Sequence, residues 1–291
     1  MQERALVSVV TPSFNSGSFL EETLRSVLAQ DYPRIEYIVM DGGSSDGTLE
    51  ILERHRDRLC FESRPDRGTA DAVNRGFGLS KGSILAWLSA DDTYLPGAVS
   101  AAVTAFAENP DAGVVYGDGL WVDAAGKLIG PYPTRPFERE LLGRECFLCQ
   151  PAVFLRRSVY ERVGGLDPGL ESCYDWDLWM RIARLYPMVR IEQCLATSRM
   201  HPGNKTLGRR RMVYSEACRI LRKHYQYVPF QWTYDYARFL IQRRDGFSVP
   251  FQPSVPGYLL SLILGIRFNA RHLPRFLREW VAAANLGRPS A

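Results

Sequence analysis

Two adjacent carboxylates, Asp91 and Asp92, follow a short apolar segment at residues 84–88. Neighbouring negative charges repel each other unless a cation or hydrogen-bond donors neutralise them. A hard divalent ion held by carboxylate oxygens, with phosphate oxygens completing its shell, meets that need. The alternative is a helix N-cap, because acids favour the positive end of a helix and Pro96 follows closely. The dipeptide by itself leaves both interpretations open.

Asp41 stands in a similar position, after the apolar segment at residues 35–40 and before Gly42 and Gly43. A carboxylate there suits hydrogen bonding to a nucleobase or a ribose, because glycines let a ligand approach the backbone closely. An ordinary Asx-turn explains the same residues equally well.

The elements that must position these residues alternate between apolar strands and amphipathic helices. Strands are expected at 6–11, 35–40, 59–62, 84–88 and 113–116, with helices after the capping box Ser18-x-x-Glu21, from Leu49, at 70–79 and from about Pro96. This rhythm predicts an α/β fold with a mostly parallel sheet covered on both faces. Ligands bind beyond the carboxyl ends of such strands, where the polar clusters at 11–15, 41–46 and 91–92 fall.

The rhythm changes after Gly117. A hairpin is expected over 120–129, turning near Ala125 and Gly126, then a strand at 152–155 and a short helix opened by a second capping box, Ser158-x-x-Glu161. A further helix begins near Asp175. Two basic helical segments are expected at 209–224 and 267–280, the second with its arginines along one face.

Composition describes an ordinary folded protein of 291 residues, with 46% hydrophobic and 23% charged residues. The net charge of +4 is unevenly spread. Residues 205–291 contain 15 Lys and Arg against 4 Asp and Glu, a net charge of +11, which leaves −7 for residues 1–204. The sequence therefore has an acidic body, residues 1–204, and a basic tail, residues 205–291.

Targeting signals are absent from the sequence pattern. The first eleven residues lack the apolar run of a signal peptide, and prolines interrupt the uncharged window at 246–266, so we expect a cytoplasmic protein with no transmembrane helix. The six cysteines are then expected to be reduced. Cys146 and Cys149 have C-x-x-C spacing without a second pair, which favours two small apolar side chains entering a strand over a zinc site.

Eight short motifs, in order, resemble those of family 2 glycosyltransferases with the GT-A fold, of the bacterial polysaccharide and O-antigen type. They are Val9-Val-Thr-Pro-Ser-Phe-Asn15, Asp41-Gly-Gly-Ser-Ser-Asp-Gly-Thr48, Asp66-Arg-Gly-Thr-Ala-Asp-Ala-Val-Asn-Arg-Gly76, Ser89-Ala-Asp-Asp92, Gln150-Pro151, Gly164-Gly-Leu-Asp167, Tyr174-Asp-Trp-Asp-Leu-Trp179 and Arg199-Met-His201. Each motif is short, but their joint order and spacing over residues 5–206 are specific.

The resemblance implies an inverting transfer of a sugar from a nucleotide diphosphate donor to an acceptor hydroxyl. It implies a catalytic domain over 1–206, with a donor half at 1–118 and an acceptor half at 119–206, and a basic helical extension over 207–291. The residues that match donor-binding positions are Thr11, Pro12 and Phe14 around the base, Asp41 bonded to it, and Asp71 and Asn74, with Val73 in place of the family's Arg.

The same resemblance makes Asp91 the final acid of the family's D-x-D motif, which binds Mn²⁺ or Mg²⁺. Ser89 replaces the first acid, so Asp92 or His201 is expected to assist. Arg199, His201 and Lys205 lie in a basic segment, and positive charge there suits the leaving diphosphate, while a neutral imidazole also ligates metals.

Displacement at an anomeric carbon requires a base that removes the proton of the acceptor hydroxyl. Asp175 opens its predicted helix and is expected to be this base in preference to Asp177, which faces elsewhere on the helix. Acids at this position also serve as helix caps. Trp179 is expected in the core, whereas Trp176 either stacks on a sugar or packs in the core.

The basic tail suits a helix lying on anionic lipid, where a lipid-linked glycan or polysaccharide acceptor would be found, on the inner face of the plasma membrane. A solvated face on an accessory helical domain explains it equally well. No nucleic-acid recognition module is evident. A sugar nucleotidyltransferase should have a glycine-rich basic loop after the first strand, and residues 11–17 lack one. A non-catalytic nucleotide-sugar-binding protein is the remaining alternative.

Overall fold

The computed structural model describes residues 5–286, and the chain divides into two compact units. Unit 1 comprises Met1–Leu142 and Cys146–Met200, and unit 2 comprises Gly143–Glu145 and His201–Ala291. Residues 1–4, which belong to the signal-peptide argument, and residues 287–291 of the expected basic extension lie outside the described residues. The domain bounds expected at 118 and 206 stay a prediction.

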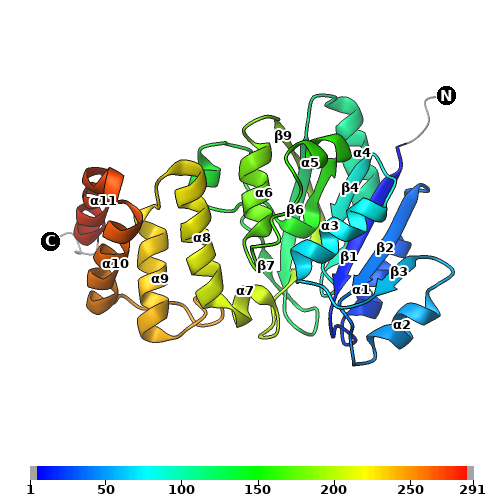
Figure 1. The fold of residues 1–291 in the computed structure, drawn as a ribbon, viewed down its shortest axis with the longest axis horizontal. Helices are drawn as coiled ribbons and strands as arrows, with labels where there is room; N and C mark the ends of the chain where they lie inside the picture. The colour runs from blue at the N-terminus through cyan, green and yellow to red at the C-terminus, as the bar shows by residue number, and fades with distance from the viewer. Residues whose placement is uncertain (1–4, 287–291) are drawn as a thin grey trace. The chain divides into compact units, whose positions relative to one another are not determined.

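Unit 1 is built on one mixed sheet with the strand order β3-β2-β1-β4-β8-β6-β9-β5, and β7 pairs with β6 (Figure 1). The strands are β1 (Val7–Ser13), β2 (Ile35–Asp41), β3 (Cys60–Ser63), β4 (Ile84–Trp87), β5 (Thr93–Tyr94), β6 (Val114–Val122), β7 (Leu128–Pro131), β8 (Val153–Arg156) and β9 (Met188–Arg199). The first four sheet positions are parallel, as are β6 and β9, whereas β8 is antiparallel to both of its neighbours. The predicted α/β class is confirmed. Each antiparallel pair of the sheet includes β7, β8 or β9.

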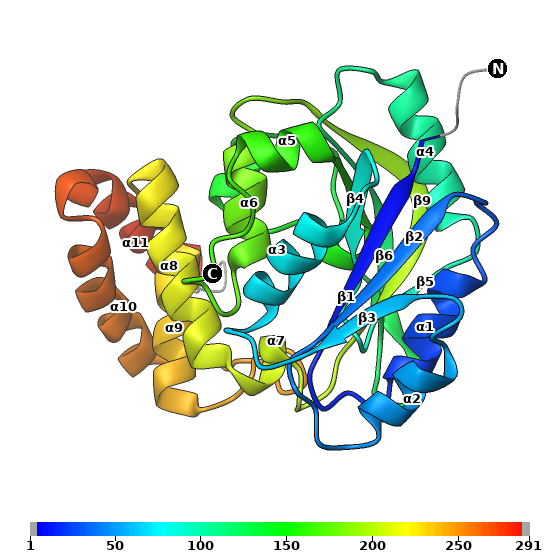
Figure 2. The same ribbon diagram turned by 45° about the vertical axis from the view of Figure 1, so that its right-hand side comes forward.

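Helices cover both faces of this sheet, as the alternating pattern predicts. They are α1 (Leu20–Leu28), α2 (Thr48–Arg54), α3 (Thr69–Leu79), α4 (Ala98–Glu108), α5 (Arg157–Arg162) and α6 (Tyr174–Ile182), with 3-10 turns at Leu141–Gly143 and Gln150–Ala152. Helices α1, α2 and α4 lie on one side, and α3, α5 and α6 lie on the other (Figure 2). Because both faces are covered, all seven residues of β1 are buried.

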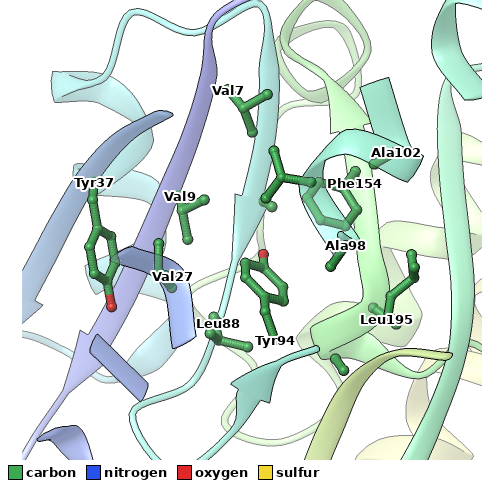
Figure 3. Packing of buried hydrophobic residues seen from close by; sticks show 14 of the residues in the cluster. Val7, Val9, Val27, Tyr37, Leu88, Tyr94, Ala98, Ala102, Phe154 and Leu195 are labelled. Carbon is green, nitrogen blue, oxygen red and sulfur yellow. The ribbon is translucent and has the colours of Figure 1, made fainter. Parts of the chain in front are cut away.

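The largest described core cluster joins alternate residues of β1 to the helices on the α1 and α4 side. Figure 3 shows Val7 and Val9 of β1 with Val27 and Ala98 from this layer. Tyr94 stacks on Phe154 there, with ring centroids 5.6 Å apart. This packing fixes β1 and β4, whose carboxyl ends carry the polar clusters.

Two predicted capping boxes are wrong. Helix α1 has Phe19 at its N-cap without a side-chain bond, and the carbonyl of Ser16 accepts from the first backbone N–H groups instead. Helix α5 begins at Arg157, so Ser158 lies inside the helix. At α5 the first amide, Arg157 N, donates to the distant carbonyl of Ser83 at 3.0 Å, so neither helix needs the boxed serine.

Strands in the second half of unit 1 differ from the expected ones. The hairpin turning at Gly126 is confirmed, but β6 runs through Gly117 and Gly119, which pack against Leu195 and Cys149 where no Cβ would fit. The burial pattern of β9 does not alternate regularly, so period two is weak in its sequence.

Unit 2 is helical. Its elements are α7 (Lys205–Gly208), α8 (Arg210–Tyr225), α9 (Phe230–Gln242), α10 (Val255–Phe268), a 3-10 turn (Ala270–His272) and α11 (Leu273–Leu286). The expected single basic helix over 267–280 is wrong, because α10 ends at Phe268 and the Asn269 side chain bonds the backbone of Val228 instead. Across the described part of the chain, no helix is long and apolar enough to cross a membrane.

Candidate active site

The loops that follow β1, β2 and β4 meet at one edge of the sheet, as expected for parallel neighbours. Backbone and side-chain bonds join the first two loops. Gly42 N donates to Ser13 O at 2.8 Å, Asn15 N donates to Ser44 Oγ at 2.7 Å, and Ser45 N donates to Asn15 Oδ1 at 2.9 Å. These bonds hold the first two loops together at this edge.

The three residues expected around a nucleobase differ in exposure. Thr11 and Pro12 are buried within β1, and the Thr11 hydroxyl lies 3.0 Å from the Tyr37 hydroxyl. Both belong to the strand itself and not to the loop after it, because β1 extends through Ser13, and their contact with a base stays a prediction. Phe14 is 63% exposed and its ring lies beside Gly42, so it is the residue of the three that presents a surface to a ligand.

Asp41 ends β2 and is almost fully buried. One carboxylate oxygen accepts from the backbone N–H groups of Gly43 at 3.0 Å and Ser44 at 2.9 Å, and from the Ser63 hydroxyl at 2.6 Å. The other oxygen accepts from the Ser44 hydroxyl. This is the Asx-turn that the sequence left as an alternative. Hydrogen bonding from Asp41 to a nucleobase stays a prediction.

Helix α3 carries the other two expected donor-binding residues. The Asp71 carboxylate pairs with Arg67 at 2.7 Å, and the hydrogen bond from Arg67 lowers its pKa, against the opposing effect of burial. Asn74 donates to Leu166 O at 2.9 Å and accepts from Leu166 N at 3.0 Å and from the Tyr160 hydroxyl. The predicted role of Asn74 in donor binding is not supported, because its amide anchors the loop that contains Leu166.

The acidic pair after β4 does not cap a helix. Helix α4 begins at Ala98 with Gly97 at its N-cap, so the capping alternative is wrong. Asp91 is partly exposed, whereas Asp92 is buried and its Oδ1 accepts from Arg199 N at 2.8 Å. Burial and then the charge of Asp91 raise the pKa of Asp92 well above its ordinary value, although Arg199 opposes this shift. Exposure therefore favours Asp91 as the ligand-facing acid.

Arg199 is buried at the end of β9 and holds this acidic segment in place. Its Nε donates to Asp91 O at 2.9 Å, its Nη1 donates to the carbonyls of Asp123 at 3.3 Å and Ala124 at 3.2 Å, and its Nη2 pairs with Glu22 at 2.6 Å. The expected contact of Arg199 with a diphosphate is therefore not supported, because the guanidinium is buried and bonded to protein groups. The sequence shows no sign of Glu22 as its partner, since the two residues lie 177 positions apart.

The two acids of α6 have opposite environments. Asp177 is fully buried and accepts from Arg181 Nε at 2.8 Å, while Arg181 also donates to the carbonyls of Val163 and Gly165. Asp175 is partly exposed, and its Oδ1 accepts from Trp176 N at 2.7 Å. The Asp177 carboxylate is therefore buried and bonded inside the protein. Of the two acids, Asp175 is the one that a substrate can reach.

Tyr174 is a buried phenol whose pKa is affected by the candidate acids. Burial and the charge of Asp175, with smaller effects from Asp91 and Asp92, raise the pKa of the Tyr174 hydroxyl, which also hydrogen-bonds the Thr69 side chain. These carboxylates thus lie within electrostatic range of one phenol. Sequence reasoning missed Tyr174 and Thr69, although both stand inside the quoted motifs.

The tryptophans of α6 belong to the core. Trp179 stacks on Trp87 with centroids 5.5 Å apart, which confirms its expected place. Trp176 is also buried and donates to Leu142 O at 3.0 Å, so the sugar-stacking alternative is wrong. The cysteines expected to be reduced are free in the structure, with Cys149 buried and Cys146 partly buried.

A bound metal ion needs several donor atoms in one place. Among the described residues, no three His, Cys, Asp or Glu side chains form a group able to hold a metal ion. Mg²⁺ is commonly bound by one or two carboxylates, with substrate phosphates and water completing its shell. The partly exposed carboxylate of Asp91 fits this kind of site, which forms fully only with a diphosphate present. The expected assistance of Asp92 in metal binding does not fit the structure, because that carboxylate is buried and bonded to the backbone.

His201 and Lys205 belong to unit 2. The His201 carbonyl accepts from Asn204 N at 3.0 Å, and Asn204 caps α7, whose first residue is Lys205. Their roles toward a metal and a diphosphate stay predictions.

Comparison with known proteins places the chain in a family. The sequence model of Glycosyl transferase family 2 matches residues 8–164, more than half of the chain. A Rickettsia typhi protein named as an uncharacterized glycosyltransferase is 29% identical over 209 residues, which cover 69% of this chain and 66% of that protein. A Mycobacterium bovis PGL/p-HBAD biosynthesis glycosyltransferase is 30% identical over 60% of this chain and 69% of its own length.

The chain spans about a third to two thirds of the first curated relatives it matches. Among solved structures, Staphylococcus aureus TarS 1–349 in complex with UDP-GlcNAc superposes with a TM-score of 0.63 and 16% identity, covering 90% of this chain and 80% of that one. The Pyrobaculum calidifontis mannosyltransferase PcManGT, in complex with GDP-Man and Mn²⁺, gives 0.60 and 20% identity, covering 98% and 88%. These likenesses show the GT-A fold. Together with the family match, they establish that the chain belongs to glycosyl transferase family 2.

Proposed function

We propose that this protein is an inverting glycosyltransferase, which transfers a sugar from a nucleoside diphosphate sugar to an acceptor hydroxyl. The observation that carries the proposal is the contrast in burial among four acids. Asp91 and Asp175 are partly exposed and lie within electrostatic range of Tyr174, whereas Asp92 and Asp177 are buried and bonded to the protein.

In the proposed reaction, the Asp175 carboxylate accepts the proton of the acceptor hydroxyl. The acceptor oxygen forms a bond to the anomeric carbon while the bond from that carbon to the diphosphate oxygen breaks. A single displacement inverts the configuration at that carbon. Asp91 holds a divalent ion, Mn²⁺ or Mg²⁺, which when bound neutralises charge on the departing diphosphate. The Trp176 amide, which donates to Asp175, orients the carboxylate.

The donor and acceptor classes are part of the same proposal. TarS and PcManGT were solved with UDP-GlcNAc and GDP-Man, and one relative is the O-antigen biosynthesis protein RfbC of Myxococcus xanthus, 30% identical over 63% of this chain and 15% of that protein. These names support a nucleotide-diphosphate sugar donor and a saccharide or lipid-linked acceptor for this chain. We also propose that it works at the inner face of the plasma membrane, as a peripheral protein.

A thermal-shift screen tests the donor class. Ligands that bind only the folded state raise the unfolding midpoint, and a concentration of 100 times Kd contributes about 2.7 kcal/mol of stability. We expect one nucleotide sugar to raise the midpoint more than the rest, and more with Mn²⁺ than with a chelator. Equal midpoints with every nucleotide sugar, with and without the metal, would refute the proposed donor class.

A further inference from the structure

Helix α10 has a buried face made of small residues. Gly257, Ser261 and Gly265 recur every four positions and are all buried. A Cβ at Gly265 would collide with the Phe276 ring, and one at Gly257 would lie 3.1 Å from Arg238 Cγ. These residues let α10 pack closely on its neighbours in unit 2, where Tyr258 and Leu262 of the same helix also contact the core cluster.

The opposite face of α10 is apolar and exposed. Val255, Leu259, Ile263 and Ile266, spaced by four, four and three residues, are 74%, 55%, 64% and 45% exposed. This spacing puts them on one stripe of the helix. We call these four residues the α10 stripe. Solvent-facing helix positions are ordinarily polar, and a contiguous exposed apolar stripe marks a surface that another phase or molecule covers.

Positive charge follows the stripe in sequence. Arg267 ends the exposed face of α10, and Arg271, Arg275 and Arg278 follow on the next two elements, all exposed. Glu279 is the one acid between residues 246 and 286, and it pairs with Arg275 at 3.6 Å. A second copy of the chain would bring the same arginines and repel them. An anionic lipid surface offers both an apolar layer and compensating charge.

We propose that the α10 stripe lies in the interfacial layer of an anionic bilayer, with α10 parallel to the membrane plane. A helix of 14 residues is about 21 Å long, shorter than the roughly 30 Å hydrocarbon core, which is why it lies on the bilayer and does not span it. The inference deepens the proposed function, on which it rests for its purpose, since an acceptor carried on a lipid must be reached at a membrane.

Vesicle co-sedimentation of the full-length protein tests this inference. The test variant is Leu259→Gln with Ile263→Gln, at exposed positions whose replacement should not disturb the packed face. The matched control is Leu128→Gln with Ile129→Gln, the same residue pair at 59% and 49% exposure on β7. The vesicles contain phosphatidylcholine alone or with phosphatidylglycerol. Circular dichroism confirms folding, and donor-induced thermal shift is measured on the same samples.

We expect the unmodified protein and the control to bind the phosphatidylglycerol vesicles, and the test variant to bind at least about tenfold more weakly, because two apolar side chains are lost from the bilayer contact. Binding equal to the unmodified protein would overturn the inference. So would no binding by the unmodified protein, or a dimer in light scattering that the test variant abolishes. Donor stabilisation retained in all three proteins shows that such a failure concerns the membrane surface alone and leaves the proposed function standing.

Discussion

Four aspartates of the candidate site have similar sequence contexts but differ in burial. Asp92 accepts from Arg199 N and Asp177 accepts from Arg181, and both are buried. Asp91 and Asp175 stay partly exposed. A carboxylate that is already bonded in the interior cannot approach a substrate without leaving an unpaired partner behind, at a cost of several kcal/mol. The environment, and not the residue type, therefore assigns the chemical roles.

Asp91→Asn tests the proposed metal ligand. The amide keeps the shape of the side chain but removes the charge that attracts a divalent ion, so Mn²⁺ should no longer strengthen donor binding. We expect the Mn²⁺-dependent gain in donor affinity to fall by about tenfold or more in titration calorimetry.

The matched control is Asp111→Asn, an exposed acid in the turn before β6. It should keep the full Mn²⁺ effect. An Asp91→Asn protein whose donor affinity still rises with Mn²⁺ as in the unmodified chain would remove Asp91 from the metal site.

At the scale of elements, α3 packs closely against the sheet at Gly76, where a larger residue would not fit. A Cβ at Gly76 would lie 2.6 Å from Val10 Cγ1 of β1, a separation that real structures avoid. The same helix carries Asn74, whose amide bonds the backbone of Leu166. The fit of α3 against β1 therefore also sets the position of the loop before α6.

Gly76→Ala should destabilise unit 1, because overpacking a tight contact costs about 1–3 kcal/mol. At Gly78 on the same helix, a methyl group would meet no atom within 4 Å, so Gly78→Ala should instead add up to about 1 kcal/mol through helix propensity. Thermal unfolding of the two variants measures the difference. A Gly76→Ala midpoint at or above that of Gly78→Ala would show that α3 is not held by this contact.

Local patterns in the sequence were sufficient for the first half of the sheet. β4 is a continuous apolar run and β1 and β2 are rich in apolar and β-branched residues, and the loops after these strands meet because parallel neighbours end at the same edge. Long-range contacts decided the rest. The pairing of Arg199 with Glu22, and the glycines that let β6 continue past Gly117, depend on residues distant in sequence. No local pattern reports such partners.

At the scale of the whole molecule, the net charge of +4 separates into −7 over residues 1–204 and +11 over residues 205–291. The carboxylates proposed to bind the metal and the acceptor proton lie in the acidic part. The basic part carries the α10 stripe, which is apolar and exposed. The acidic part thus supplies the carboxylates of the proposed reaction, and the basic part has the charge suited to the proposed contact with anionic lipid.

The most direct test of the proposed activity is release of nucleoside diphosphate, in the presence of donor, divalent metal and acceptor, by the purified protein and by its Asp175→Asn variant. Losing a general base costs about 100-fold or more in rate. We predict such a loss in Asp175→Asn with the donor-induced thermal shift unchanged, and normal release by the Asp111→Asn control. Release by Asp175→Asn at the rate of the unmodified protein would contradict the assignment of Asp175 as the general base.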